Sequence, residues 1–232
     1  MGKRPNHIGV IMDGNRRWAK SHALRSVLEG HSRGVDTFIE LCHLCAEFEI
    51  PYLTVYAFST ENWRREKEEV DGLFNLMKKF FTDEVDTCVE RGYKMNVVGD
   101  LSMLSEDSRQ TVMATMEKTK DCKKLHCNIA ISYGGRDEII RAAKAYGRDL
   151  LDGKASLDID EDGFASYLDT AGMPDIDLVI RTGGDKRLSN FFPWQTVYSD
   201  FFFTDVLWPD FGREEFVKAI DYYGDVRINK GK

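Results

Sequence analysis

The sequence lacks long apolar segments, has no excess of basic residues and contains few cysteines. Nowhere in its 232 residues do 18 consecutive apolar residues occur, and the opening stretch "MGKRPNHIG" lacks the apolar region of a secretory signal, so we expect a cytoplasmic protein. The formal net charge of -7 argues against nucleic acid as a partner, because phosphate backbones are bound by basic protein faces. The five cysteines are odd in number and irregularly spaced, which indicates reduced thiols.

The chain also lacks the glycine-rich motifs of ordinary nucleotide-binding proteins. Neither a Walker A sequence nor a GxGxxG fingerprint occurs, and no repeat at the period of a solenoid is present. The hydrophobic fraction of 42% and the charged fraction of 31% are ordinary for a globular protein. We therefore expect residues 1–232 to form a single domain with a sizeable core.

Short apolar runs rich in Val, Ile and Tyr alternate with segments of helical periodicity. The runs predict strands at 8–12, 52–58, 94–99, 127–133, 177–182 and 200–205. The longer segments predict helices at about 30–49, 67–91, 105–121, 136–151 and 212–222. This alternation predicts an α/β fold with a central, mostly parallel six-stranded sheet flanked by helices, in which sites form at the carboxyl ends of strands.

One acidic and two basic residues follow the first predicted strand, in "IGVIMDGNRRWAKS". The strand ends at Asp13, Gly14 lets the backbone turn, and a helix is predicted to begin near Asn15. The free N–H groups of the helix start, with Arg16 and Arg17, suit diphosphate oxygens, while Asp13 could hold a divalent cation that bridges the same phosphates. The alternative is that the acid only caps the helix and that both arginines are solvated.

Two further polar clusters follow later predicted strands. The block "FSTENWRR" places Ser59 and Asn62 after the second strand. The block "IRTGGDKRLSNF" combines Arg181, Arg187 and Ser189 with two glycines that permit close approach of a phosphate to the backbone. Because the carboxyl ends of parallel strands share one edge of a sheet, the three clusters are expected to converge on one rim.

Six blocks of the sequence together resemble the cis-prenyltransferase (undecaprenyl diphosphate synthase) family. In the family's order they are "HIGVIMDGNRRWA", "GHSRG", "YAFSTENWRR", "ISYGGRDEI", "DLVIRTGGDKRLSNF" and "FTDVLWPDF". The resemblance implies a Mg²⁺-dependent transferase that condenses isopentenyl diphosphate onto an allylic diphosphate, typically farnesyl diphosphate, with formation of cis double bonds. It also implies a homodimer and an apolar tunnel for the growing chain. Peripheral contact of the protein with a membrane during product release is compatible with it.

The resemblance further implies roles for individual residues. Asp13 would bind Mg²⁺ and assist departure of the allylic diphosphate, and Asn62 would handle a proton near the reacting carbons. Asp200, where the family usually has Glu, would complete the metal site, although its side chain is one methylene shorter and Mg²⁺ tolerates poor geometry badly. The implied substrate-binding residues are Gly14, Asn15, Arg16, Arg17, Trp18, Arg25, His31, Ser59, Thr60, Glu61, Trp63, Arg65, Arg181, Arg187 and Ser189, of which the last three would hold the isopentenyl diphosphate.

Other functions stay open at this point. The small Ala57 favours a long product such as undecaprenyl diphosphate, a lipid carrier of cell-wall synthesis, over a short or branched one. A non-catalytic partner subunit would typically lose Asp13 and the Arg187/Ser189 pair, which this chain keeps. A phosphatase with an aspartate nucleophile would want a second acid where Asn15 stands. The segment between Arg25 and His31 is longer than in most members of the family, so Arg25 or His31 could be displaced from its family position.

Two short motifs suggest metal sites of other kinds. The stretch "DIDEDGFASYLD" at 158–169 partly fits the spacing of an EF-hand loop, and the alternative is a solvated loop that leads into a short helix. Cys42 and Cys45 form a CxxC pair that could bind zinc, but a second close pair is absent and both cysteines lie within a predicted helix.

Overall fold

The computed structural model describes residues 3–225, so the two first residues and the C-terminal tail of the expected domain lie outside the described part. Its strands are β1 (His7–Ile11), β2 (Tyr52–Ser59), β3 (Tyr93–Val98), β4 (Leu125–Tyr133), β5 (Leu178–Arg181) and β6 (Asp200–Phe203). They form one six-stranded sheet in the order β3-β4-β2-β1-β5-β6, with every neighbouring pair parallel. The predicted α/β class and the six predicted strands are confirmed.

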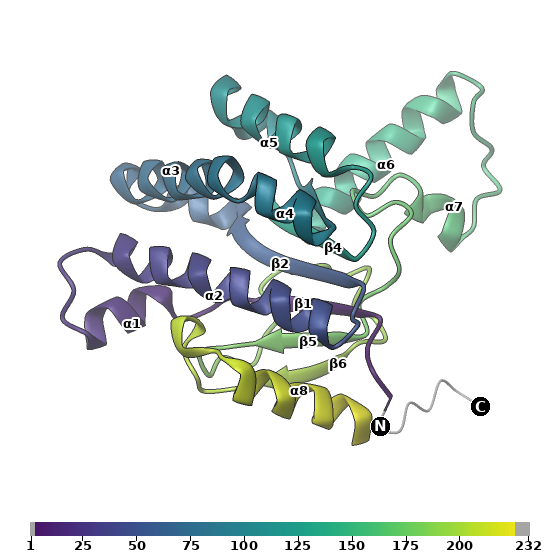
Figure 1. The fold of residues 1–232 in the computed structure, drawn as a ribbon. Coiled ribbons are helices and arrows are strands. Elements are labelled where there is room, and N and C mark those ends of the chain that lie inside the picture. Colours follow the sequence, from purple (N-terminus) through teal and green to yellow (C-terminus); the bar gives the residue numbers. More distant parts are fainter. Residues whose placement is uncertain (1–2, 226–232) are drawn as a thin grey trace.

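The helices connect these strands and cover the sheet (Figure 1). They are α1 (Asn15–Ser21), α2 (Val27–Glu47), α3 (Lys67–Asp83), α4 (Val85–Arg91), α5 (Glu106–Thr119), α6 (Gly135–Leu151), α7 (Glu161–Ala165) and α8 (Arg213–Asp225), with short 3-10 turns η1 (Thr60–Arg64), η2 (Leu101–Met103) and η3 (Trp208–Asp210). None of the helices within residues 3–225 is long and apolar enough to cross a membrane.

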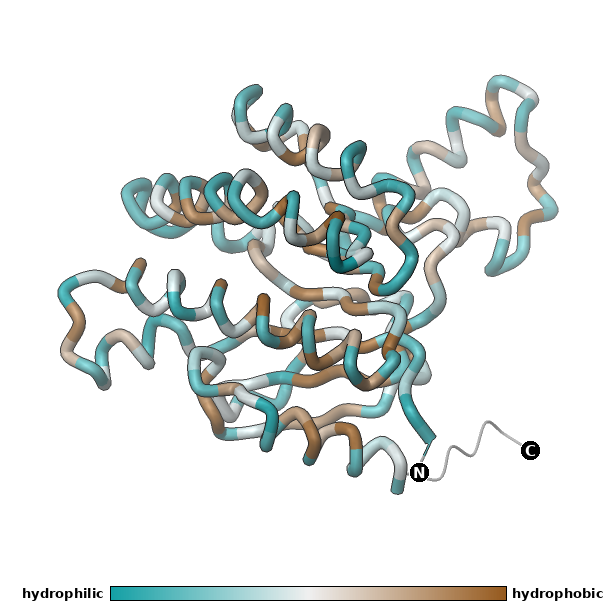
Figure 2. Tube along the Cα trace, in the orientation of Figure 1, coloured by the Kyte–Doolittle hydropathy of each residue, from teal (hydrophilic) through white to brown (hydrophobic). Residues whose placement is uncertain are grey.

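The core lies on both faces of the sheet, because successive side chains of a strand point to opposite faces. Ile8 and Val10 of β1 belong to the larger core, which contains apolar side chains of α2, α3, α5 and α8. Ile11 of the same strand belongs to a second core on the other face, where the rings of Phe191 and Phe192 pack. The central strands are accordingly apolar on both faces, as their brown colour in Figure 2 shows.

Two helices differ from their predicted bounds. The helix predicted over 67–91 is divided into α3 and α4 by a bend at Glu84, although the N–H of Glu84 still bonds to the carbonyl of Phe80. The helix predicted from residue 30 begins earlier, at Val27, because Ser26 and Glu29 form a capping box at its start. The first turn of α2 therefore contains part of the stretch that precedes the histidine of "GHSRG".

The side chains of the two other candidate metal motifs are engaged within the fold. Asp160 accepts a hydrogen bond from the N–H of Gly163 at 2.8 Å and so caps α7, while Asp169 forms an ion pair with Arg141 at 2.6 Å. Cys42 and Cys45 are buried free thiols. In the part of the chain that the structure describes, no group of three or more His, Cys, Asp or Glu side chains is arranged to hold a metal ion.

Candidate active site

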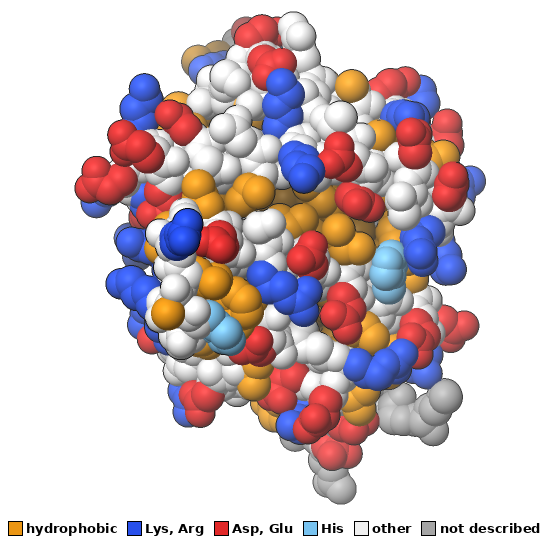
Figure 3. All heavy atoms as spheres, turned by 60° about the vertical axis from the view of Figure 1, so that its left-hand side comes forward, with side chains coloured by type: hydrophobic (Ala, Val, Ile, Leu, Met, Phe, Trp, Pro, Cys, Tyr) orange, Lys and Arg blue, Asp and Glu red, His pale blue; other side chains and the backbone are white. Residues whose placement is uncertain are grey.

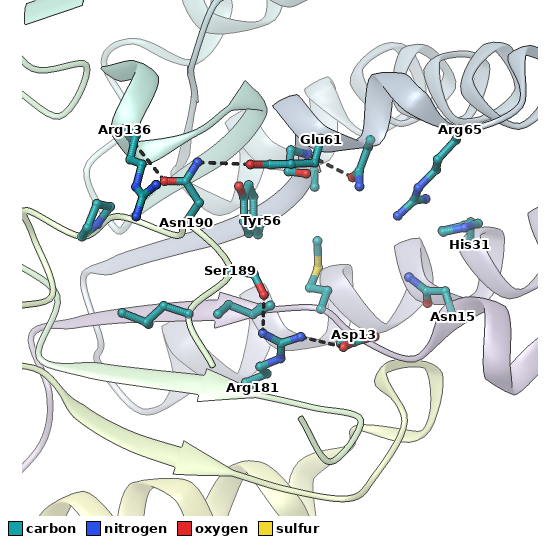
Figure 4. A pocket seen from close by; sticks show the side chains of 17 residues that line it. Asp13, Asn15, His31, Tyr56, Glu61, Arg65, Arg136, Arg181, Ser189 and Asn190 are labelled. Carbon is teal, nitrogen blue, oxygen red and sulfur yellow. Dashed lines mark hydrogen bonds and ion pairs between the residues drawn. The ribbon is translucent and has the colours of Figure 1, made fainter. Parts of the chain in front are cut away.

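The three polar clusters do converge, because β2, β1 and β5 are neighbours in the sheet. Their carboxyl ends surround a cavity of about 820 Å³, here called the polar cavity (Figure 4). The implied site residues that line it are Asp13, Asn15, His31, Ser59, Glu61, Asn62, Arg65, Arg181 and Ser189. The sequence therefore predicted correctly that these side chains share one rim.

Asp13 lies in the wall of this cavity, where its carboxylate contacts two guanidinium groups. Arg181 donates to one carboxylate oxygen at 2.9 Å, and Arg17 donates to the other at 3.1 Å. The backbone N–H of Asp13 in turn bonds to the hydroxyl of Thr182 at 3.0 Å, which fixes the residue against the end of β5. Arg17 also reaches the carbonyl of Gly183 at 2.6 Å, and a Cβ on this glycine would lie 2.4 Å from the guanidinium. Asp13 thus holds the guanidinium groups of Arg17 and Arg181 close to each other beside the polar cavity.

The loop after β5 is held in a conformation that non-glycine residues rarely adopt. Ser189, Asn190 and Phe192 have φ angles of 50°, 67° and 42°. This tight turn brings the hydroxyl of Ser189 within 2.8 Å of Arg181, whose guanidinium donates to it. Backbone strain of this kind persists where the surrounding structure enforces it, often at ligand-binding sites.

A buried acid that the sequence analysis did not single out organises the other end of the cavity. Glu69 of α3 accepts a hydrogen bond from Arg65 at 3.0 Å, and its carboxylate lies 3.7 Å from the His31 ring and 3.8 Å from Arg16. Burial, reinforced by the nearby Arg65 guanidinium, lowers the pKa of His31 to about 4, so the ring is neutral at neutral pH. The four-residue spacing of Arg65 and Glu69 is a sequence signal that could have identified this pair.

Three residues that line the cavity each have one fully buried polar atom without a hydrogen-bond partner. The atoms are Oδ1 of Asn15, Nε2 of His31 and Nε of Arg181, judged among the described residues. Leaving a buried donor or acceptor unsatisfied costs about 1–3 kcal/mol.

The "STEN" turn is organised by its own side chains. Oδ1 of Asn62 accepts the backbone N–H of Ser59 at 3.1 Å, which closes the first turn of η1. Trp63 does not line the cavity. Its indole N–H donates to the hydroxyl of Ser132 at 3.0 Å and its ring stacks on Phe74, so it packs behind the residues that form the cavity wall. The fixed amide of Asn62 thereby presents its remaining N–H groups near Ser59.

Several implied residues lie outside the cavity lining. Arg25 is exposed and precedes the cap of α2, so its side chain is not brought to the cavity. Trp18 donates to Asp210 at 2.8 Å and so ties α1 to η3. Arg187 pairs with Asp185 at 2.6 Å. The remaining residues outside the lining are Gly14, Arg16 and Thr60, each adjacent in sequence to a lining residue, and Arg17, two residues after Asn15.

Within one chain, the structure does not bring Asp200 beside Asp13. Asp200 pairs in register with Leu178, the first residue of β5, whereas Arg181 beside Asp13 ends that strand. Three residues of a strand span about 10 Å. Asp200 therefore lies near the amino ends of the strands, whereas Asp13 lies at their carboxyl ends. The backbone N–H of Asp200 bonds to the carbonyl of Asp177 at 2.8 Å.

A second, apolar pocket of about 90 Å³ adjoins the polar cavity. The two share Met12, Asn15, His31 and Ala57 in their walls. The rest of the apolar pocket is lined by Gly34, Val35, Phe38, Val55, Leu73, Leu76, Met77, Phe80, Phe81, Ile129 and Trp208. On the surface, apolar side chains gather in a hollowed band between α2 and α3 (Figure 3). Helix α3 contributes both to the core, through Val70, Leu73 and Phe81, and to the wall of this pocket, through Leu76, Met77 and Phe80.

A cavity rich in guanidinium groups that opens into an apolar pocket defines an α/β protein for an amphipathic anion, such as a diphosphate with a hydrocarbon tail. Comparison with known proteins agrees with this class. Residues 11–231 match the family described as "Putative undecaprenyl diphosphate synthase". The chain therefore belongs to the undecaprenyl diphosphate synthase family of prenyltransferases.

Relatives and structures show how widely this family extends. The chain is 45% identical to the isoprenyl transferase of Clostridium perfringens, over 95% of this chain and 87% of that one. It is 44% identical to a tritrans,polycis-undecaprenyl-diphosphate synthase (geranylgeranyl-diphosphate specific) of Thermoplasma volcanium, over 95% and 86%. Lavandulyl diphosphate synthase from Lavandula x intermedia, solved with dimethylallyl diphosphate, superposes with a TM-score of 0.95 at 34% identity, covering 99% of both chains.

Proposed function

We propose that this member of the cis-prenyl diphosphate synthase family elongates farnesyl diphosphate with successive isopentenyl diphosphates to a long polyprenyl diphosphate of undecaprenyl type. The observation that carries the proposal is the junction of the polar cavity with the apolar pocket at Ala57. A diphosphate can lie among the arginines while its hydrocarbon tail enters the pocket between α2 and α3. A product of this kind would serve as a lipid carrier in cell-wall synthesis.

The residues of the polar cavity support ionisation of an allylic diphosphate. Breaking the allylic C–O bond develops negative charge on the leaving diphosphate, and preorganised cations stabilise charge that grows in the transition state. For the allylic diphosphate, Arg17 is held in place by Asp13 and Arg65 by Glu69. Arg181, which Asp13 also holds, and the Ser189 loop would bind the isopentenyl diphosphate. The cations are therefore positioned before the substrate arrives, so little reorganisation is needed when the bond breaks.

Asp13 is suited to hold a magnesium ion. Mg²⁺ in phosphate-transfer and diphosphate sites is commonly bound through one or two carboxylates, with most other ligands from water and substrate phosphates. The oxygens of Asp13 meet this requirement without a second acid from the same chain. When bound, the ion would supply positive charge to the leaving diphosphate.

Proton removal ends each condensation. After the new C–C bond forms, a proton passes from the former isopentenyl unit to a base, for which the released diphosphate is available, and the Asn62 amide, in the cavity wall beside Ser59, would orient the groups involved by hydrogen bonding. The neutral His31 ring does not add a positive charge that would oppose the carbocation. The apolar side chains of the adjoining pocket keep water from the cation, which water would otherwise quench.

A shorter or branched product is the second candidate. The superposition on a lavandulyl diphosphate synthase favours it, and so does the narrow apolar pocket, in which the Phe38 and Phe80 rings pack edge to face at 5.4 Å. Elongation to a long product requires side chains of α3 to move aside. The two candidates differ in the length of product and not in the chemistry of the first step.

Incubation with isopentenyl diphosphate, Mg²⁺ and one of four primers separates these candidates. The primers are dimethylallyl, geranyl, farnesyl and geranylgeranyl diphosphate, and products are sized by mass spectrometry. The proposal predicts the highest turnover with farnesyl diphosphate and products near C55. A product that stops after one condensation would support the short-chain alternative, and no product from any primer would support a non-catalytic partner subunit.

We further propose that the chain works as a homodimer and releases its product at a membrane surface. The exposed side chains of Val197 and Tyr198, just before the edge strand β6, support an interface there. The hollowed apolar band between α2 and α3 supports exit of a lipid product at the surface (Figure 3). Phospholipid vesicles should then raise the steady-state turnover, and an unchanged rate would argue against membrane release.

A further inference from the structure

Arg136 lines the polar cavity but was not among the residues that the sequence pointed to. It belongs to the first turn of α6, which follows β4. In Figure 4 it lies beside Asn190, at the end of the cavity opposite to His31 and Arg65. Asp13, Arg181 and Ser189 lie between these two ends (Figure 4).

The start of α6 is wedged against the strained loop after β5. The N–H of Gly135 donates to the carbonyl of Asn190, and the N–H of Arg136 donates to its side-chain oxygen, both at 2.9 Å. A Cβ on Gly135 would lie 1.9 Å from Cδ of Pro193, so only glycine permits this approach. Both N–H groups at the start of α6 therefore already have hydrogen-bond partners. These contacts fix the backbone of Arg136 relative to the loop that carries Ser189.

Among the described residues, no carboxylate pairs with Arg136, whereas the other arginines around the cavity each pair with one. The acids adjacent to Arg136 have other partners, since Asp137 pairs with Arg141 at 2.8 Å and Glu138 accepts from buried Tyr133 at 2.6 Å. Over residues 3–225, no ion pair or side-chain hydrogen bond of the Arg136 guanidinium is found. The other arginines around the cavity pair with carboxylates, in the combinations Arg16–Glu69, Arg17–Asp13, Arg65–Glu69, Arg181–Asp13 and Arg187–Asp185.

A cation in the first turn of a helix is also opposed by the helix dipole. An anion bound at this place would offset both the dipole and the missing carboxylate. A guanidinium is well matched to two oxygens of a phosphate group. The uncompensated charge at the cavity edge therefore indicates that Arg136 is a ligand-binding side chain.

We propose that Arg136 binds the diphosphate of isopentenyl diphosphate, together with the loop that carries Ser189 and Asn190. The inference rests on the proposed function, which assigns this loop and Arg181 to the same substrate. The allylic diphosphate is then held at the other end, near Asn15 and His31. Because α6 and the strained loop are hydrogen-bonded to each other, the residue is placed by the same contacts that place Ser189.

Steady-state kinetics of Arg136→Gln with both substrates tests this assignment. The KM for isopentenyl diphosphate should rise about tenfold, which corresponds to about 1.4 kcal/mol, while the KM for the allylic diphosphate stays within about twofold. Arg136→Lys, which keeps the charge but not the fork of donors, should lie in between. Arg148→Gln is the matched control, because Arg148 is an exposed arginine in the last turn of the same helix and does not line the cavity.

Calorimetric binding of isopentenyl diphosphate provides a readout that does not depend on turnover. Weaker binding by Arg136→Gln, at unchanged thermal unfolding temperature, supports the assignment. Unchanged binding and unchanged KM would overturn it and leave the proposed function intact, as would an equal rise of both KM values or a loss confined to kcat. A wild-type chain that binds isopentenyl diphosphate but elongates no primer would contradict the proposed function, and the binding comparison would still decide the role of Arg136.

Discussion

At the residue scale, the carboxylate of Asp13 and the guanidiniums of Arg17 and Arg181 depend on one another. Arg181 is almost fully buried, with 4% of its side chain exposed, and Asp13 provides its shortest carboxylate contact. A buried cation needs such a partner, and a diphosphate site needs the cation. The acid thus contributes to stability as well as to the chemistry proposed for it.

Asp13→Asn should abolish most of the condensation activity and leave the fold intact. The amide keeps the size of the side chain but removes the charge that would bind Mg²⁺, and loss of one preorganised electrostatic group costs about 10²–10³ in kcat. The measurement is kcat as a function of Mg²⁺ concentration, with circular dichroism as a check of folding. Asp121→Asn is the control, because Asp121 is exposed and does not line the polar cavity, and the Mg²⁺ dependence of this variant should match that of the wild type. Near-normal turnover by Asp13→Asn would remove Asp13 from the mechanism.

The buried histidines should make the protein less stable in acid. Burial lowers the pKa values of His7 and His31 to about 4, so the unfolded chain, with ordinary histidine pKa values near 6.5, binds more protons between these pH values. Stability is then fully present above pH 6.5 and is lost as the pH falls toward 4, by about 3 kcal/mol for each histidine.

Urea denaturation between pH 7 and 4 measures this loss. His31→Gln should lose about 3 kcal/mol less of its unfolding free energy over that range than the wild type. His22→Gln, at an exposed histidine, is the control. A wild-type unfolding free energy that does not depend on pH in this window would contradict the burial of these rings.

At the element scale, the strands could be predicted more fully than the contacts between helices and loops. Apolar runs located all six strands, and their parallel order was enough to bring Asp13, Ser59 and Arg181 to one rim. Glu69 and Arg136 were missed because they lie on helices, whose placement over the rim depends on packing and not on the strand pattern. Arg25 lies outside the cavity lining because the cap at Ser26 starts α2 early and leaves Arg25 in an exposed connection.

The wall formed by β2, α2 and α3 should control product length through Ala57, which lines both the polar cavity and the apolar pocket. Ala57→Leu places three additional carbons at this junction and should shorten the longest product formed from farnesyl diphosphate, while the first condensation continues. Chromatographic sizing of the products measures this. Ala143→Leu, on the exposed face of α6, is the control and should leave the product distribution unchanged. An unaltered distribution in Ala57→Leu would mean that the growing chain does not pass this junction.

At the scale of the whole molecule, the sheet ends in an uncovered strand at β6, next to apolar side chains that one chain leaves exposed. Val197 and Tyr198 are 67% and 77% exposed. Exposed apolar side chains beside an edge strand are a common basis for association. The sequence alone could not show this exposure, since the burial of a side chain depends on which elements fold over it.

The double substitution Val197→Glu and Tyr198→Glu should shift the protein from dimer to monomer. Charges at these positions would be desolvated in an interface but remain solvated in a free chain. Light scattering coupled to size-exclusion chromatography measures the mass. Leu151→Glu is the control, because Leu151 is 89% exposed at the end of α6, and this variant should remain dimeric. A wild-type monomer, or a double variant of unchanged mass, would exclude this interface.

The most direct test of the central claim is the geometry of the double bonds that the protein makes. Purified protein is incubated with farnesyl diphosphate, isopentenyl diphosphate and Mg²⁺, and the product is analysed by NMR. The account predicts an elongated chain in which the double bonds of the primer stay trans and every newly formed double bond is cis. New trans double bonds, or no elongated product, would contradict it.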